Sequence, residues 1–162
     1  MKQEIIDKLP ADAQKEFLKL ALKLEEKTKQ EKVHDSFLDF VKHVWPEFIE
    51  GPHHKKIAEK FNQIAQGKIK RLIINMPPRH TKSEFASFLL PSWMVGRRPN
   101  LKIIQSTHTT ELAIRFGRKA KTLMDSPEYK QVFKTRLRED SQAAGKWETA
   151  QGGEYYAAGV GS

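Results

Sequence analysis

The fold is decided by one stretch of the chain, RLIINMPPRHTKSE, which occupies residues 71–84. Its first part, residues 71–76, is a short run rich in β-branched side chains, which is typical of a buried strand. Residues 77–81 predict a loop, and a helix is expected from Lys82 to about Val95, because Gly96 can end it. A strand, a loop and a helix in this order predict the first unit of a parallel α/β sheet.

The flanking sequence adds helices before this unit and both kinds of element after it. Residues 11–29 favour a peripheral helix, and Ser36 with Asp39 resembles a capping box that opens a second helix, which Pro46 ends. Further helices are expected over residues 53–65 and 110–124 and after Pro127, and further strands near 101–106, 147–149 and 155–157. We therefore expect an α/β fold, a parallel sheet with flanking helices and an antiparallel addition, preceded by a helical arm at residues 1–33.

The composition favours a polyanionic partner. Lys and Arg number 29 against 20 Asp and Glu, which gives a formal net charge of +9. Between residues 55 and 82 the only acid is Glu59, among the cations Lys55, Lys56, Lys60, Lys68, Lys70, Arg71, Arg79 and Lys82. The alternative is a basic protein whose charge serves only solubility. No stretch approaches the roughly 18–20 apolar residues that span a bilayer, so no membrane partner is expected. Without cysteine, disulfides and thiolate metal sites are excluded.

The loop at residues 77–83 carries the chemistry. A phosphate-binding loop directs backbone N–H groups at the phosphates, and it supplies a Lys for the β- and γ-phosphates and a hydroxyl group that helps to hold Mg²⁺. Lys82 and Ser83 provide these side chains in the right order. However, Met76 and Thr81 occupy the two glycine positions of the G-x-x-x-x-G-K-[ST] pattern. The residues alone leave a proline-rich turn with a solvated Lys82 as the alternative.

The run from Leu72 to Glu84 resembles the ATPase signature of the terminase large subunits of tailed bacteriophages, many of which read PPRHGKSE here. Short motifs in the family's order surround it and cover about residues 37–161: FVKHVWP at 40–46, GPHH at 51–54, PSW at 91–93, GRRP at 96–99, MDSPEY at 124–129, WET at 147–149, GG at 152–153 and GVG at 159–161. Each motif alone is unspecific, and their order makes the resemblance specific.

This resemblance implies an incomplete P-loop NTPase core of the RecA-like (ASCE) type over residues 34–162. The chain is then the N-terminal portion of the ATPase domain, ending before the acidic Walker B motif and lacking the nuclease domain. In the complete protein, hydrolysis of ATP with Mg²⁺ would drive double-stranded DNA into a procapsid. The implied partners are DNA, the portal protein, the small terminase subunit and further copies in a ring. The implied location is the host cytoplasm, with transient docking on the procapsid. This chain alone is expected to hydrolyse ATP poorly.

The resemblance also assigns roles to single residues. Nucleotide binding is expected from Pro77, Pro78, Arg79, His80, Thr81, Lys82 and Ser83, with Lys82 and Arg79 catalytic and Ser83 holding Mg²⁺ with the nucleotide. Arg79 could instead pair with Glu84, and His80 could serve only loop packing. Thr81 departs from the family's glycine. We expect nucleotide binding to survive this change, because a residue at the start of a helix need not have a positive φ. His53 and His54 lie near the expected adenine pocket or simply begin a surface helix.

Two other functions remain open at this stage. One is a helicase-like or other P-loop ATPase, which downstream helicase motifs would indicate. The other is a basic nucleic-acid-binding module whose nucleotide loop no longer functions, for which DNA binding should depend on salt and not on ATP. The three tryptophans, Trp45, Trp93 and Trp147, are expected to serve core packing.

Overall fold

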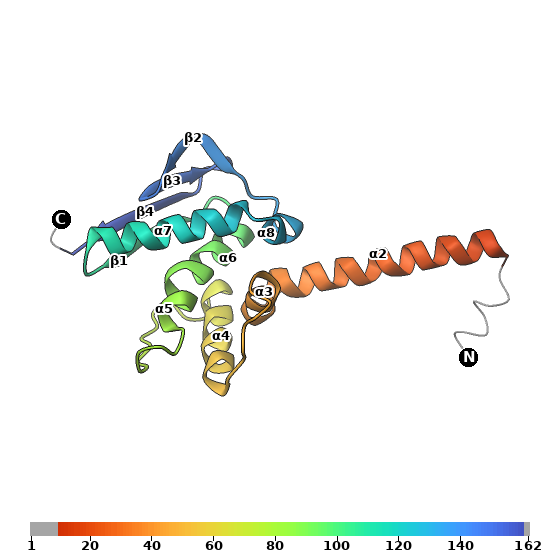
Figure 1. Ribbon diagram of the computed structural model, residues 1–162, viewed down its shortest axis with the longest axis horizontal. Helices are drawn as coiled ribbons and strands as arrows, with labels where there is room; N and C mark the ends of the chain where they lie inside the picture. Colours follow the sequence, from red (N-terminus) through yellow and green to blue (C-terminus); the bar gives the residue numbers. More distant parts are fainter. Residues whose placement is uncertain (1–9, 161–162) are drawn as a thin grey trace.

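The computed structural model describes residues 10–160, except for the side chain of Gln142, and shows an α/β fold from which one long helix projects (Figure 1). Residues 1–9 of the expected arm and Gly161 of the last motif lie outside the described residues. The helices are α2 (Ala11–Asp35), α3 (Phe37–Val44), α4 (Pro52–Ala65), α5 (Lys82–Glu84), α6 (Leu90–Arg97), α7 (Thr110–Asp125) and α8 (Pro127–Val132), and the π-helical turn η1 (Phe85–Leu89) joins α5 to α6. Among these described helices, none has the length and apolar character needed to cross a membrane.

Short polar side chains set the starts of three helices. The hydroxyl groups of Ser36, Thr109 and Ser126 accept hydrogen bonds from the backbone N–H groups three residues later, at 3.4, 3.3 and 3.3 Å. Each bond satisfies one donor that the first turn of a helix leaves unpaired. Helices α4, α7 and α8 confirm the predicted helices at 53–65 and 110–124 and after Pro127.

The sheet contains four strands: β1 (Lys102–Thr107), β2 (Leu137–Ala143), β3 (Lys146–Thr149) and β4 (Glu154–Gly159). Their order is β1-β4-β3-β2. The β1–β4 pair is parallel, whereas the β4–β3 and β3–β2 pairs are antiparallel. The predicted α/β class and the antiparallel addition are confirmed, and the sheet as a whole is mixed, with β1 and β4 as its parallel pair. Strand β2 was not predicted, because its sequence, LREDSQA, is polar.

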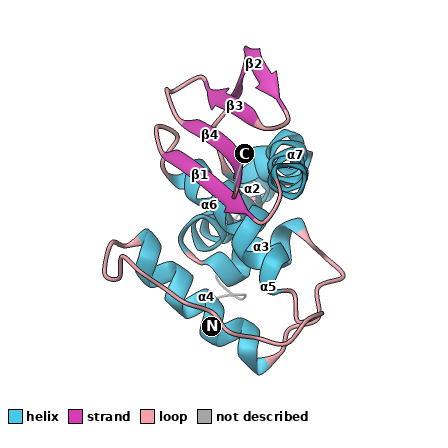
Figure 2. Ribbon diagram, turned by 90° about the vertical axis from the view of Figure 1, so that its left-hand side faces the viewer, coloured by secondary structure: helices cyan, strands magenta, loops and turns pink. Residues whose placement is uncertain are grey.

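One face of the sheet packs against α7 (Figure 2). Gly117 allows this close approach, because a Cβ atom there would lie 2.4 Å from the carbonyl oxygen of Ala144. Beneath the helix, the rings of Trp147 and Tyr155 stack at 4.7 Å between centroids. The alternate residues of β1 and β4 point to the opposite face. There the register partners Ile104 and Tyr156 remain 77% and 49% exposed.

The predicted strand at residues 71–76 is not a strand in the structure, which corrects the sequence analysis. These residues form no regular secondary structure, although their exposure alternates as in a strand. Leu72, Ile74 and Met76 pack against the core, whereas Ile73 is 86% exposed. A strand requires a neighbour that pairs with its backbone groups, and the described residues place none beside this segment.

The helix that follows the loop runs from Lys82 to Arg97 with one irregular turn. The backbone N–H of Leu90 donates to the carbonyl of Phe85, five residues earlier, which marks the π-helical turn. Pro91 accounts for it, because proline has no N–H and its ring crowds the carbonyl four residues before it. The predicted helix is confirmed here, with its end at Arg97.

Aromatic side chains form the centre of the core. The fully buried ring of Phe37 meets those of Phe61, Phe85 and Trp93 edge to face, at centroid distances of 5.0, 5.4 and 5.5 Å. Such pairs add stabilisation beyond their buried area. Trp93 and Trp147 are fully buried, and half-buried Trp45 also packs against the core, as predicted.

We predict that Phe37→Ala destabilises the protein by about 3–5 kcal/mol, since it removes an aromatic ring at the centre of the core. The matched control is Ile49→Ala, because Ile49 is 87% exposed and its truncation should change the stability by less than about 0.5 kcal/mol. Urea unfolding followed by circular dichroism measures both changes. Equal effects of the two substitutions would contradict the assignment of Phe37 to the core.

Candidate functional site

The candidate site is the loop that enters α5. Pro77, Pro78, Arg79 and His80 are exposed, whereas Thr81 and Lys82 are half-buried and Ser83 is exposed on the first helical turn. The turn is anchored by Phe85, which is fully buried and lies 5.4 Å from the ring of Phe37. The structure therefore brings all seven predicted residues to the N-terminus of one anchored helix. The first N–H groups of a helix have no acceptor within the helix and suit an anion.

The loop backbone is left-handed at two positions. Arg79 has a φ of 64° and Thr81 a φ of 58°, and they are the only non-glycine residues with positive φ in the described part of the chain. We expected that Thr81, at the start of a helix, would not need a positive φ. This expectation is wrong, because the backbone of Thr81 adopts the left-handed conformation that favours glycine. Such a conformation costs about 1–3 kcal/mol per residue and tends to occur where the surrounding structure enforces it, often at ligand sites.

A hydrogen-bonded chain holds Thr81 in this conformation. The His54 Nε2 atom lies 2.6 Å from the Thr81 hydroxyl oxygen. The hydroxyl in turn donates to the carbonyl of His80 at 2.7 Å. At the other side of the ring, His54 Nδ1 accepts from the backbone N–H of Gly51 at 2.9 Å. The imidazole therefore links the start of α4 to the loop across 27 residues of sequence.

This geometry defines the protonation state of His54. Because Nδ1 accepts a hydrogen bond, the proton of a neutral ring lies on Nε2, which then donates to Thr81. Burial lowers the pKa of His54 below its usual value, and the neighbouring imidazoles of His53 and His80 lower it further, although Glu50 opposes them. The neutral ring that the hydrogen bonds require is thus also the one that its surroundings favour.

The carboxylates near the loop in sequence are engaged elsewhere. Glu84 receives both hydrogen bonds from Lys119 of α7, each at 2.9 Å, so the alternative pairing of Arg79 with Glu84 is not formed. The adjacent acids Glu139 and Asp140 lie on strand β2, but both are exposed, and Asp140 pairs with Arg138.

A shallow groove of about 280 Å³ adjoins the loop. It lies between α4 and the extended segment before the loop, and it is lined by His53, Lys56, Ile57, Lys60, Leu72, Ile73, Ile74, Asn75 and Met76. The apolar walls suit a flat aromatic ring, and the amide of Asn75 and the ring of His53 provide polar groups at its side. His53 thus lies at a groove beside the loop, while His54 faces the loop itself.

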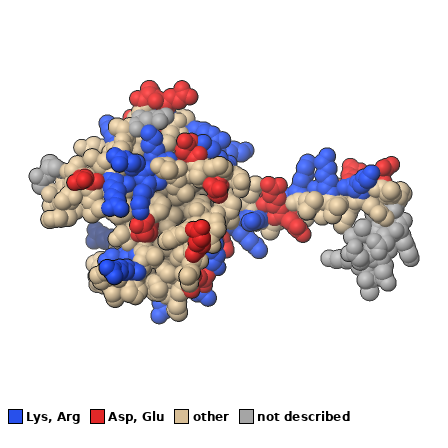
Figure 3. Space-filling view, viewed as in Figure 1, with Lys and Arg blue, Asp and Glu red and all other residues tan. Residues whose placement is uncertain are grey.

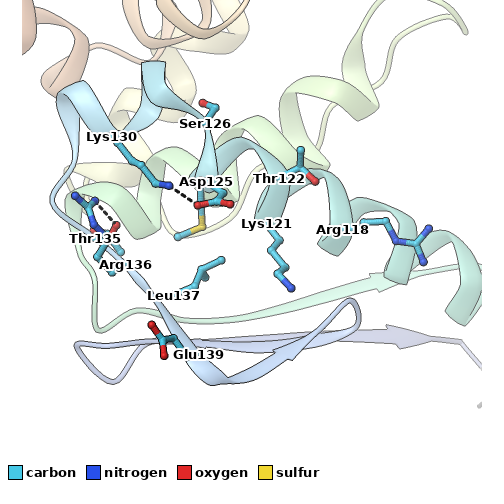
Figure 4. A pocket seen from close by; sticks show the side chains of 11 residues that line it. Arg118, Lys121, Thr122, Asp125, Ser126, Lys130, Thr135, Arg136, Leu137 and Glu139 are labelled. Carbon is cyan, nitrogen blue, oxygen red and sulfur yellow. Dashed lines mark hydrogen bonds and ion pairs between the residues drawn. The ribbon is translucent and has the colours of Figure 1, made fainter.

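A second, larger cavity of about 580 Å³ lies under α7 (Figure 4). Lys121 extends from α7 toward the sheet, whereas Arg118 points away from the other labelled residues (Figure 4). Lys130 pairs with Asp125, and Arg136 donates to the carbonyls of Phe133 and Thr135. Because Lys130 and Arg136 are committed to these neighbours, the cavity is a weaker anion site than the loop.

Comparisons with known proteins give no family for the chain. No family model matches it, and neither a curated protein nor a solved structure does.

Sequence reasoning missed the contact between His54 and Thr81. His53 and His54 were expected near the adenine pocket through the resemblance alone. No pattern in the sequence indicates that an imidazole will meet a loop hydroxyl 27 residues away. The contact depends on how α4 packs against α3, and that packing is a tertiary feature.

We predict that His54 and Thr81 are energetically coupled. His54→Ala should destabilise the wild-type protein by about 1 kcal/mol more than it destabilises the Thr81→Gly variant, in which no hydroxyl group remains to be bonded. The cavity left by the missing ring is common to both backgrounds and cancels. Urea unfolding of the four proteins in this cycle measures the coupling.

Thr122→Gly provides the control, because Thr122 lies on the exposed side of α7 and His54 should not be coupled to it. The two changes should add within about 0.3–0.5 kcal/mol. If the effects of His54→Ala and Thr81→Gly on the free energy of unfolding also added within about 0.3–0.5 kcal/mol, the coupling would be refuted.

Proposed function

We propose that the loop at residues 77–83 binds Mg-ATP, and that the chain is part of an ATPase motor that moves double-stranded DNA into a viral procapsid. The observation that carries the proposal is the loop itself, which is strained at two positions and positioned at the start of an anchored helix. The conformation also places a left-handed residue directly before right-handed Lys82 and Ser83. Such an alternation turns successive backbone N–H groups toward one side, as anion-binding nests do.

The side chains give each part of the nucleotide a partner. Lys82 would contact the β- and γ-phosphates, Ser83 would hold Mg²⁺ with the nucleotide, and exposed Arg79 would stabilise charge on the transferred phosphoryl group. The groove lined by His53, Lys56 and Ile74 would take the base. Pro77, Pro78 and His80 shape the loop, and His80 does so through its hydrogen bond to the carbonyl of Pro78 at 2.8 Å.

The motor function rests on the resemblance together with the charge of the surface. Figure 3 shows Lys and Arg side chains gathered over α7, where Arg115 and Arg118 are exposed. Cations there suit the phosphates of DNA. In the complete protein, the remaining partners would be the portal protein, the small terminase subunit and neighbouring copies in a ring. Hydrolysis of ATP needs carboxylates that hold Mg²⁺ and orient the attacking water. Glu84 does not supply one, because it is paired with Lys119.

We predict that the wild-type chain binds Mg-ATP and that Lys82→Ala weakens this binding at least tenfold, because a cation at the phosphates is lost. Isothermal titration calorimetry with Mg-ATP measures both affinities. Lys68→Ala is the matched control, since Lys68 is an exposed lysine that follows the opposite end of α4, and it should leave the affinity unchanged.

A folded wild-type chain that binds no Mg-ATP would sink the proposal. If such a chain still bound DNA in a salt-dependent manner, a nucleic-acid-binding module would describe it instead. Equal losses in Lys82→Ala and Lys68→Ala would indicate general electrostatic attraction rather than a site.

A further inference from the structure

Helix α2 is attached to the domain only through its last turns. Of its 25 residues only Val33 is buried. The indole N–H of Trp93 donates to the carbonyls of Val33 and His34, at 3.3 and 3.1 Å, and Arg97 lies 3.5 Å from Asp35. These contacts satisfy the end of the helix, while the remainder projects away from the domain (Figure 1).

The projecting part carries an apolar stripe. Ala13, Phe17, Leu20 and Leu24 follow one another at spacings of four, three and four residues, which places them on one side of a helix in a heptad pattern. Phe17, Leu20 and Leu24 are 46%, 60% and 66% exposed. In Figure 3 uncharged side chains follow one side of the projecting part of this helix, and charged side chains of both signs follow the other. A solvent-exposed helix of this kind is stabilised mainly by the burial of such a stripe against a partner.

We propose that the stripe pairs with the stripe of a second copy of this chain, in an antiparallel two-helix contact. In the register that faces Phe17 of one copy with Leu20 of the other, every layer is apolar. Ala13 then faces Leu24, Phe17 faces Leu20, and the same two layers repeat by symmetry. The match follows from the order of the four residues along the stripe, because their spacings read the same in both directions. A symmetric contact of this type is closed and ends at a dimer.

The charges beside the stripe select the antiparallel direction. Glu16 and Lys23 flank the stripe on the same side, one heptad apart, and both are exposed. In the antiparallel pair Glu16 of each copy lies beside Lys23 of the other, which forms two attractive contacts. In a parallel pair each of these positions would instead meet the residue five positions further along the other copy, so Glu16 would face the uncharged Ala21. A partner of another kind would not need this internal complementarity between two positions of one helix.

Sedimentation velocity of the purified chain over a wide range of concentrations tests the proposal. The wild type is expected to dimerise reversibly, and Leu20→Lys is expected to raise the dissociation constant at least tenfold. The control is Leu22→Lys, because Leu22 is 58% exposed but lies outside the stripe, and this change should leave the association as it is. A wild type that stays monomeric, or equal effects of both substitutions, would overturn the proposal.

A charge exchange tests the direction of the pair. Glu16→Lys and Lys23→Glu should each weaken the dimer, and the double variant should restore the wild-type affinity, because each copy again offers one charge of each sign. Failure of the double variant to restore affinity would overturn the antiparallel register. Circular dichroism checks that all variants keep their helix. None of these measurements depends on nucleotide, so their outcome is independent of whether the chain is part of an ATPase.

Discussion

The burial of Phe85 fixes the geometry on which the candidate site depends. Its ring lies 5.4 Å from Phe37 of α3, 5.1 Å from His54 of α4 and 5.5 Å from Phe48 in the connection between those helices. Since Phe85 follows Lys82 by three residues, these contacts determine where the loop ends and where the helix begins. They also bring His54 to the loop, so one buried side chain positions both the helix and the imidazole that holds Thr81.

Most helices and three strands could be predicted from the sequence, because local signals specify them. Ser36, Thr109 and Ser126 mark helix starts through hydrogen bonds with residues three positions away, and α7 has a clear apolar face. The strand at residues 71–76 was wrong for a tertiary reason: its composition favours a strand, but no described neighbour pairs with it. Strand β2 was missed because its polar sequence lies at the exposed edge of the sheet, where pairing with β3 suffices.

The position of the candidate loop could be predicted from the sequence, whereas its backbone conformation could not. The order of Lys82 and Ser83 after a proline-rich loop identified the segment, and the structure brings these residues to a helix N-terminus. The positive φ of Thr81 could not be read from the sequence, because a threonine there argues against it. Only the hydrogen bond from His54, contributed by another helix, accounts for a β-branched residue in that conformation.

Tertiary contacts hold Thr81 in a backbone conformation that glycine would adopt without them. A glycine would adopt the left-handed conformation freely, whereas Thr81 is held there by a neutral imidazole whose other nitrogen is fixed by the backbone of Gly51. The loop therefore has a defined shape before any ligand arrives, and a preorganised loop loses little conformational freedom on binding. We propose that this preformed loop binds the phosphates of a nucleotide.

Mapping of backbone amide chemical shifts during titration with Mg-ATP tests that claim most directly, since it reports on the loop residue by residue. The account predicts the largest changes at the amides of residues 79–84, accompanied by changes at His53 and Asn75 along the adjoining groove. Changes confined to the cavity beneath α7, with the loop amides unmoved at saturating nucleotide, would contradict it.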